Sequence, residues 1–152
     1  RQMCIRDRTT PMTTTQPHRQ TLLTPPELHP DMELVMRVMP MPKDANGNGD
    51  IFGGWIMSHV DLAGCVIPAR IAKGKIATIA VNEFVFRTAV SIGDLLSFYA
   101  RVEKVGNSSI TMHVEVWAER RPAAPIVVKV TEAKVVYVAI DHEGKPRPIP
   151  KD

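Results

Sequence analysis

Apolar and polar positions alternate along the second half of the chain. The alternation is clear in residues 94–105 and again in residues 109–117. Residues 76–86 are rich in β-branched and aromatic side chains, and residues 126–140 form a long apolar run with a polar centre. These patterns are typical of β-strands. They predict four long strands, and the short connections between the last three make those strands antiparallel neighbours.

A different pattern fills residues 53–74, which are apolar on nearly every side of a helical projection. They predict one long helix, which Pro68 kinks or shortens and Gly74 stops. A helix of this kind must be covered by other elements. With a short strand at 32–41 and a loop at 43–50, the predicted fold class is α+β: a curved antiparallel sheet of about five strands wrapped around one long central helix.

The first part of the chain shows no such periodicity. Residues 1–30 are rich in Thr, Pro, Gln and Arg, a composition that does not build a core. The opening RQMCIRDR resembles a translated sequencing adapter, which would place the native start at Met12. We therefore expect residues 1–30 to be a disordered or non-native N-terminal extension, and residues 31–152 to form one domain.

Composition narrows the class of partner. The net charge of +3 is mild and aromatic residues make up only 5%, which disfavours a nucleic-acid binder. Cys4 and Cys65 lie far apart, which disfavours a disulfide scaffold or a zinc site and suits a reducing compartment. No secretion signal or membrane-spanning run is visible. We expect a cytoplasmic protein with no nucleic-acid or membrane partner.

Asp61 is the residue of the predicted helix that most needs an explanation. No cationic side chain lies three or four positions away from it. Burying an unpaired carboxylate costs several kcal/mol. One interpretation is an exposed Asp, or one paired with a distant residue such as Arg87. The other is a general base or nucleophile in a water-poor cleft.

The entrance of the helix offers a second candidate feature. Gly53 and Gly54 leave the backbone N–H groups of a helix N-terminus open to a ligand, and such groups suit a developing oxyanion. They also suit close helix–strand packing. Asp61 lies seven positions after Gly54, two turns further on the same face. Asn46, in the preceding loop, is either a turn residue or an amide that orients a water or a carbonyl.

Anionic ligands have candidate partners elsewhere in the chain. Arg87, Lys145 and Arg147 could meet phosphate groups or could simply be solvated. A turn with backbone N–H groups and hydroxyls that could also hold a phosphate consists of Gly106, Asn107, Ser108 and Ser109. His113 falls on the polar face of its strand, where surface placement is expected. No cluster has the spacing of a metal site, so neither a metal nor a cofactor is predicted.

Four stretches together resemble a known family. They are MPKDANGNGDIFGGWIMSHVDLAG (41–64), VNEFVFRTAVSIGD (81–94), VEKVGNSSITMHVEVW (102–117) and VTEAKVVYVAIDHEGKPRPIP (130–150). They are similar to hotdog-fold acyl-CoA thioesterases of the YciA-like branch, over about residues 32 to 150. The resemblance implies the hotdog fold, which agrees with the element order. It also implies hydrolysis of acyl-CoA to a free acid and CoA, with no cofactor beyond the coenzyme A of the substrate.

The resemblance also assigns roles. Asp61 falls on the family's catalytic acidic position, and Asn46 on an asparagine supplied by the opposite subunit. Gly54 or Gly53 falls where a backbone N–H polarises the thioester carbonyl. The turn at 106–109 and the basic C-terminal segment lie where relatives contact CoA, although Asn107 stands where relatives carry Arg. The implied assembly is a homodimer with joined sheets and interfacial sites, built further into a trimer of dimers.

Two other classes of function stay open at this point. A hotdog dehydratase or hydratase would want a His at the helix entrance, where Phe52 stands. A non-catalytic acyl-CoA-binding module would not need Asp61. Release of free thiol from acyl-CoA separates the hydrolase from both alternatives.

Overall fold

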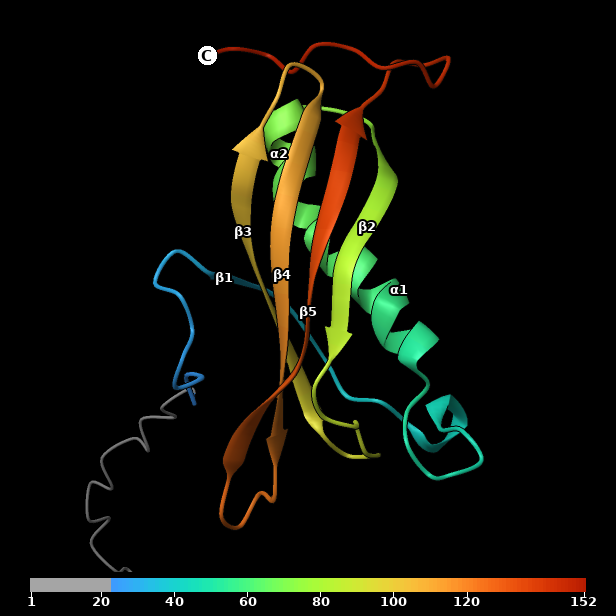
Figure 1. Cartoon of the computed structure of the whole chain (residues 1–152), viewed down its shortest axis with the longest axis vertical. Helices are drawn as coiled ribbons and strands as arrows, with labels where there is room; N and C mark the ends of the chain where they lie inside the picture. The colour runs from blue at the N-terminus through green and yellow to red at the C-terminus, as the bar shows by residue number, and fades with distance from the viewer. Residues whose placement is uncertain (1–22) are drawn as a thin grey trace, which may run out of the picture.

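The computed structural model describes residues 23–152, which form one antiparallel sheet with two consecutive helices against one face (Figure 1). In chain order the elements are β1 (Glu33–Val38), the short 3-10 helix η1 (Pro42–Asp44), α1 (Gly53–Gly64), α2 (Val66–Ala72), β2 (Ile76–Phe86), β3 (Leu95–Val105), β4 (Ser109–Arg120) and β5 (Ile126–Ala139). The strand order is β1-β3-β4-β5-β2, so β1 and β2 form the two edges. This is the predicted α+β hotdog arrangement, a curved sheet that is not closed into a barrel.

Period-2 alternation builds the core. The inward-facing residues of β3 and β4, among them Phe98, Ala100, Met112 and Val114, are completely buried against the helices. Their polar neighbours in sequence point to the opposite face, which no other element of the described chain covers (Figure 1). The sheet therefore has a helix face and an outer face, and both carry side chains of chemical interest.

The predicted long helix is present, and it is interrupted once, so that it consists of two consecutive segments, α1 and α2. α1 ends at Gly64 and α2 begins at Val66, with Cys65 between them outside either helix. Pro68 explains the break, because a proline at that position cannot donate a backbone hydrogen bond to the carbonyl of Gly64. The interruption thus falls one turn beyond Asp61.

The two ends of the helical segment are capped differently, and only the C-terminal end departs from the prediction. The residue before α1 is Phe52, and it makes no side-chain cap hydrogen bond. At the far end, Lys73 rather than Gly74 takes the left-handed conformation, with φ of 50°. Gly74 instead provides space, because a Cβ there would lie 2.7 Å from Nη2 of Arg147.

The predicted disordered or non-native extension, residues 1–30, lies mostly outside the part of the chain that the structure describes. Residues 1–22, most of the expected disordered or non-native extension, lie outside the described residues. Residues 23–32 contain turns and no helix or strand. Among the helices of residues 23–152, none is long and apolar enough to cross a membrane.

Candidate functional site

Asp61 lies on the helix face, half-buried, and its carboxylate accepts a hydrogen bond from a neutral group. Oγ1 of Thr78, on β2, donates to Oδ1 of Asp61 over 2.6 Å. Within the described chain no Lys or Arg forms an ion pair with Asp61, and Arg87 pairs with Glu132 instead. The carboxylate is therefore oriented by a hydroxyl and keeps lone pairs for another proton or an electrophile.

The nearest thiol is held in its neutral form. Burial, followed by the charge of Asp61, raises the pKa of Cys65. Its Sγ donates to the backbone carbonyl of Leu62 over 3.1 Å. A thiol nucleophile requires the thiolate, so Asp61 rather than Cys65 is the reactive candidate in this part of the chain.

Asn46 organises the loop that leads into α1. Its Oδ1 accepts hydrogen bonds from the backbone N–H groups of Asn48 (2.9 Å) and Asp50 (3.2 Å). These contacts identify the amide oxygen, because only an acceptor can face two N–H donors. The NH2 group of Asn46 has no partner among the described residues and is left to donate to a ligand. Turn-forming and ligand-binding roles are thus compatible in one side chain.

The N-terminus of α1 opens into a pocket of about 370 Å³. Asn46, Gly53 and Arg87 line it, together with an apolar wall that includes Ile56 and Phe86. Gly53 is in close contact with this wall, since a Cβ there would lie 3.2 Å from the Phe86 ring and would require the ring to shift slightly. Within the described chain its N–H has no backbone acceptor, as expected of a first helical turn.

Two of the predicted catalytic residues lie outside this pocket. Gly54 does not line it and has open space around its Cα. Asp61 is two turns further along α1, about 10 Å along the helix axis. One chain therefore brings Asn46 and Gly53 together but does not bring Asp61 to them.

The predicted phosphate contacts fall into two separate groups. Arg87 is in the pocket beside Asn46, near the end of β2 and the start of α1. The turn between β3 and β4 lies at the other end of the sheet, beside the C-terminal segment (Figure 1). There, backbone hydrogen bonds join Asn107 to Ile149 and Ser108 to Ala139. Gly106 donates to the carbonyl of Ser109, which closes the turn.

The two basic residues of the C-terminal segment have local partners. Nζ of Lys145 lies 2.9 Å from Glu143, and both side chains are exposed. Nη2 of Arg147 donates to the carbonyl of Ala72 over 2.8 Å, and its Nε donates to Ile140 over 3.0 Å. Arg147 thus satisfies a free carbonyl at the C-terminal end of α2, which is a structural use of the guanidinium.

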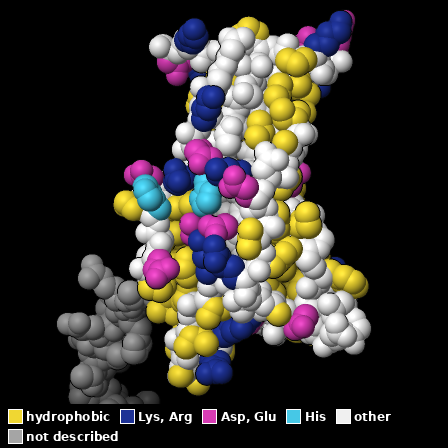
Figure 2. Space-filling model, viewed as in Figure 1, with side chains coloured by type: hydrophobic (Ala, Val, Ile, Leu, Met, Phe, Trp, Pro, Cys, Tyr) yellow, Lys and Arg dark blue, Asp and Glu magenta, His cyan; other side chains and the backbone are white. Residues whose placement is uncertain are grey.

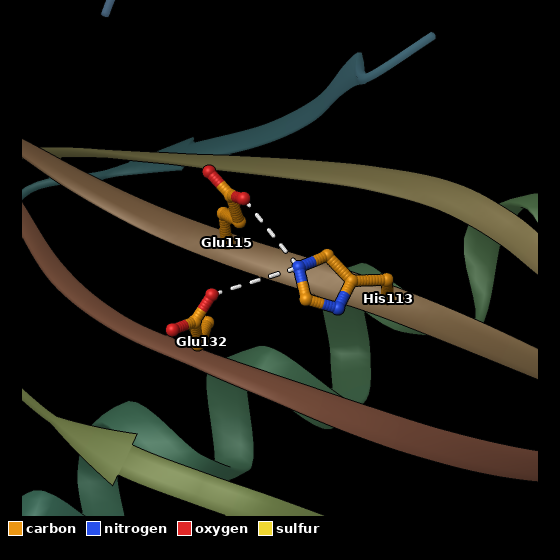
Figure 3. Close-up of side chains that lie close together, drawn as sticks. All are labelled: His113, Glu115 and Glu132. Atoms are coloured by element: carbon orange, nitrogen blue, oxygen red, sulfur yellow. Dashed lines mark ion pairs between the residues drawn. The ribbon is translucent and has the colours of Figure 1, made fainter. Parts of the chain in front are cut away.

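A group of charged side chains, here called the outer cluster, occupies the middle of the outer face (Figure 2). Nε2 of His113 lies 3.4 Å from Glu115 and 3.7 Å from Glu132 (Figure 3). Nζ of Lys129 lies 3.3 Å and 2.8 Å from the same two carboxylates. Arg87 pairs with Glu132 as the fifth member.

The outer cluster stabilises its own carboxylates. Burial tends to raise the pKa of Glu115, but hydrogen bonds from His113 and Trp117 and the charge of Lys129 lower it to about 2. Hydrogen bonds from Lys129 and Arg87 likewise lower the pKa of Glu132. Two carboxylates and a His have the geometry of a cation site, but Lys129 already occupies the cationic position between the carboxylates.

The sequence analysis missed the roles of Thr78 and of the outer cluster because both depend on contacts between different strands. Thr78 sits in an ordinary strand pattern, and His113 was expected at the surface, whereas its side chain is only 17% exposed. Only the cross-strand register shows that Glu115 lies directly opposite Glu132. Two like charges directly opposite each other on neighbouring strands need a cation between them. Aligning β4 with β5 in the sequence would therefore have predicted such a cation.

Comparison with known proteins agrees with this geometry. The family described as "Thioesterase superfamily" matches residues 48–124. Acyl-CoA thioester hydrolase YciA of Salmonella typhimurium is 46% identical over 123 residues, which is 80% of this chain and 92% of that protein. YciA of Escherichia coli K12 is 43% identical over 123 residues, 80% and 93% of the two chains. The chain belongs to the hotdog-fold thioesterase superfamily, in its YciA-like branch.

Solved structures give the same result. The hexameric thioesterase y2039 from Yersinia pestis has a TM-score of 0.76 and 44% identity, covering 82% of this chain and 100% of that chain. HI0827, a hexameric broad-specificity acyl-coenzyme A thioesterase, has a TM-score of 0.73 and 43% identity, covering 78% and 82%.

Proposed function

We infer that this protein hydrolyses acyl-CoA thioesters to a free carboxylic acid and CoA. The observation that carries the inference is a half-buried carboxylate, Asp61, that is oriented by the Thr78 hydroxyl and left without a cation. Membership of the YciA-like thioesterases supplies the substrate class, and the pocket beside Asn46 and Gly53 supplies a place for the thioester.

The chemistry assigns one task to each group. Asp61 takes a proton from the attacking water, or attacks the thioester carbonyl itself to give a mixed anhydride that water then opens. The NH2 group of Asn46 holds the water or the carbonyl. The N–H group of Gly53, which lines the pocket, or that of Gly54 stabilises the oxyanion at the positive end of the α1 dipole. The CoA thiol leaves with a proton, and no cofactor takes part.

A second copy of the chain can bring Asp61 close to Asn46 and Gly53, which a single chain does not do. β2 is an edge strand with unpaired backbone groups and exposed apolar side chains, including Ile79 (61%) and Val81 (42%). On α1, Met57 and Leu62 are exposed as well. We propose a homodimer joined through this surface, in which Asp61 of one subunit meets Asn46 and Gly53 of the other. Further assembly into a trimer of dimers follows the hexameric relatives.

The remaining parts of the proposal concern the CoA moiety and the compartment. Arg87 and the turn at 106–109 lie at opposite ends of one sheet. An antiparallel dimer would bring Arg87 of one subunit closer to the turn at 106–109 of the other, so that both could contact one CoA molecule. Lys145 stays a candidate CoA contact, whereas Arg147 has a structural use that limits its reach. We propose a cytoplasmic location, for which the widely spaced cysteines are the support.

The test is thiol release from a panel of short- to long-chain acyl-CoAs, followed by identification of the acid product. We expect stoichiometric free thiol and free acid, unchanged by a chelator. Binding of acyl-CoA without thiol release would indicate a binding module. A change in the acyl chain with the thioester intact would indicate a dehydratase or hydratase. Either of these results would contradict the hydrolase.

The assembly has its own test in a matched pair of variants. Val81 on β2 and Ile126 at the start of β5 are similarly exposed, at 42% and 40%. Val81→Lys should lower the molar mass measured by light scattering and abolish thiol release, because the two halves of the site separate. Ile126→Lys should leave both unchanged. An active Val81→Lys protein of unchanged mass would refute the proposed interface.

A further inference from the structure

A buried tyrosine holds the backbone of Asp61. The hydroxyl of Tyr137 donates to the carbonyl oxygen of Asp61 over 2.8 Å, and the side chain is only 1% exposed. Tyr137 on β5 lies directly across from Thr78 on β2 in the strand register. Neighbouring side chains of the sheet therefore bind the two ends of one residue: Thr78 binds the carboxylate and Tyr137 binds the peptide carbonyl.

The helix needs such a contact at this position. The carbonyl of Asp61 accepts the N–H of Cys65 over 3.1 Å, and α1 ends at Gly64, the residue before Cys65. Beyond it Pro68 offers no N–H, so the next helical turn lacks a hydrogen bond. Asp61 thus lies in the last regular turn before a break, where helical hydrogen bonding alone fixes its direction weakly.

Gly64 creates the space for the hydroxyl. A Cβ at this position would lie 2.4 Å from Oη of Tyr137 and 3.3 Å from Cγ2 of Val114. The first distance is far below any normal contact, and the buried ring cannot swing away because the core surrounds it. A glycine is therefore required here if the tyrosine hydroxyl is to reach Asp61.

The hydroxyl also stays a donor under all ordinary conditions. Burial, followed by the negative charge of Asp61, raises the pKa of Tyr137 well above its ordinary value. A phenol that does not ionise donates its proton at every pH at which the enzyme would work.

We propose that Tyr137 is a positioning residue for the hydrolysis: its hydroxyl, admitted by Gly64, fixes the helix turn that aims the Asp61 carboxylate at Thr78 and the thioester. This inference rests on the proposed function, since it concerns the same carboxylate. It assigns catalytic importance to a contact with a main-chain carbonyl, which neither the polarity nor the spacing of the sequence suggests.

Tyr137→Phe removes the hydroxyl and keeps the ring. We expect kcat for acyl-CoA to fall about fivefold to tenfold, because the reacting group loses its alignment, with KM changed less than twofold. Tyr99→Phe, at the buried tyrosine of the outer face, is the matched control and should leave kcat unchanged. A Tyr137→Phe protein that unfolds at a lower temperature but keeps the wild-type kcat would show a merely structural hydroxyl and overturn the proposal.

A double-mutant cycle with Gly64 gives the sharper result. Gly64→Ala alone should lower kcat at least as much as Tyr137→Phe, because the methyl group clashes with the hydroxyl and pushes the helix turn away from it. In the Tyr137→Phe background the clash at 2.4 Å no longer exists, so Gly64→Ala should cost much less than it does in the wild type. Equal losses in both backgrounds would overturn the coupling. Absence of thiol release from the wild type would instead contradict the proposed function itself.

Discussion

The two faces of the sheet hold their carboxylates in opposite ways. On the helix face, Asp61 is bound by the neutral hydroxyl of Thr78 and lies next to apolar side chains. On the outer face, Glu115 and Glu132 share Lys129, and the pKa of each is lowered by its donors. A carboxylate tied to cations is a weak base, whereas one oriented by a hydroxyl remains free to take a proton. The difference separates a reactive group from a structural one.

The same comparison explains why the larger group of charged side chains, the outer cluster, is not the expected site of the reaction. The outer cluster brings five ionisable side chains together, yet its two carboxylates are balanced by Lys129 and Arg87. Replacing a partner should therefore change stability on the outer face and turnover on the helix face.

Removing the shared cation should have the largest effect on stability. Lys129→Met keeps the aliphatic stem but removes the cation that Glu115 and Glu132 share, and leaves only Arg87 and His113 to pair with them. We expect a loss of about 2 kcal/mol in the free energy of unfolding, measured with urea, because these ion pairs are partly buried and their loss leaves Glu115 without its cation. Specific activity at a temperature where the variant is folded should change little.

The control for that variant is Lys134→Met, a lysine of the same face whose carboxylate partners are more exposed. It should change the unfolding free energy much less. Equal losses in the two variants would mean that the outer cluster has no special role in stability.

Removing the hydroxyl donor on the helix face should affect turnover instead. Thr78→Val keeps the shape of the side chain and loses the 2.6 Å hydrogen bond to Asp61. We expect kcat to fall about tenfold, equivalent to one hydrogen bond of about 1.4 kcal/mol. Thr78→Ser should restore most of the rate in thiol-release assays.

Thr111→Val, on the outer side of β4, is the matched control and should keep the wild-type kcat. The account of Asp61 orientation would be wrong if Thr78→Val and Thr111→Val had the same activity. It would also be wrong if serine at position 78 failed to restore turnover in a folded protein.

Lowering the pH should decrease the stability of the folded protein gradually, through protonation of the carboxylates of the outer cluster, and this effect should be smaller than the preceding ones. The pKa of Glu115 is about 2 in the folded protein against an ordinary value of 4.5. Its contribution to stability is therefore complete above pH 4.5 and is lost as the pH falls from 4.5 towards 2. The lowered pKa of Glu132 acts in the same direction.

Thermal unfolding followed by circular dichroism checks this prediction. The wild-type melting temperature should drop over that interval, and Glu115→Gln should show a lower melting temperature at neutral pH with a flatter decline in acid. Parallel curves for the two proteins would contradict the linkage.

Much of the fold was predictable because strand patterns are local. Residues 76–86 were predicted with the bounds of β2, and the alternation in 94–105 gave the faces of β3 correctly. Pro68 was predicted to kink or shorten the helix, but the break itself lies three residues earlier, at Cys65. The reason is that the donor missing at Pro68 would have paired with the carbonyl of Gly64.

The site was less predictable because its contacts join elements distant in sequence. Asp61 was identified from its apolar surroundings alone, but its partners Thr78 and Tyr137 become visible only when β2 and β5 are aligned. Glu115 and Glu132 likewise depend on a register that shifts between Val116 and Trp117. Such a shift in strand register cannot be located from the pattern of apolar and polar residues in one sequence.

The most direct test places Asp61→Asn and Glu115→Gln side by side, with kcat for acyl-CoA and the free energy of unfolding measured on the same preparations. Asp61→Asn should lose at least about 100-fold in kcat while its stability stays close to wild type. Glu115→Gln should lose stability and keep a kcat near wild type. An Asp61→Asn protein that still turns over acyl-CoA at nearly the wild-type rate would contradict the claim that this carboxylate performs the chemistry.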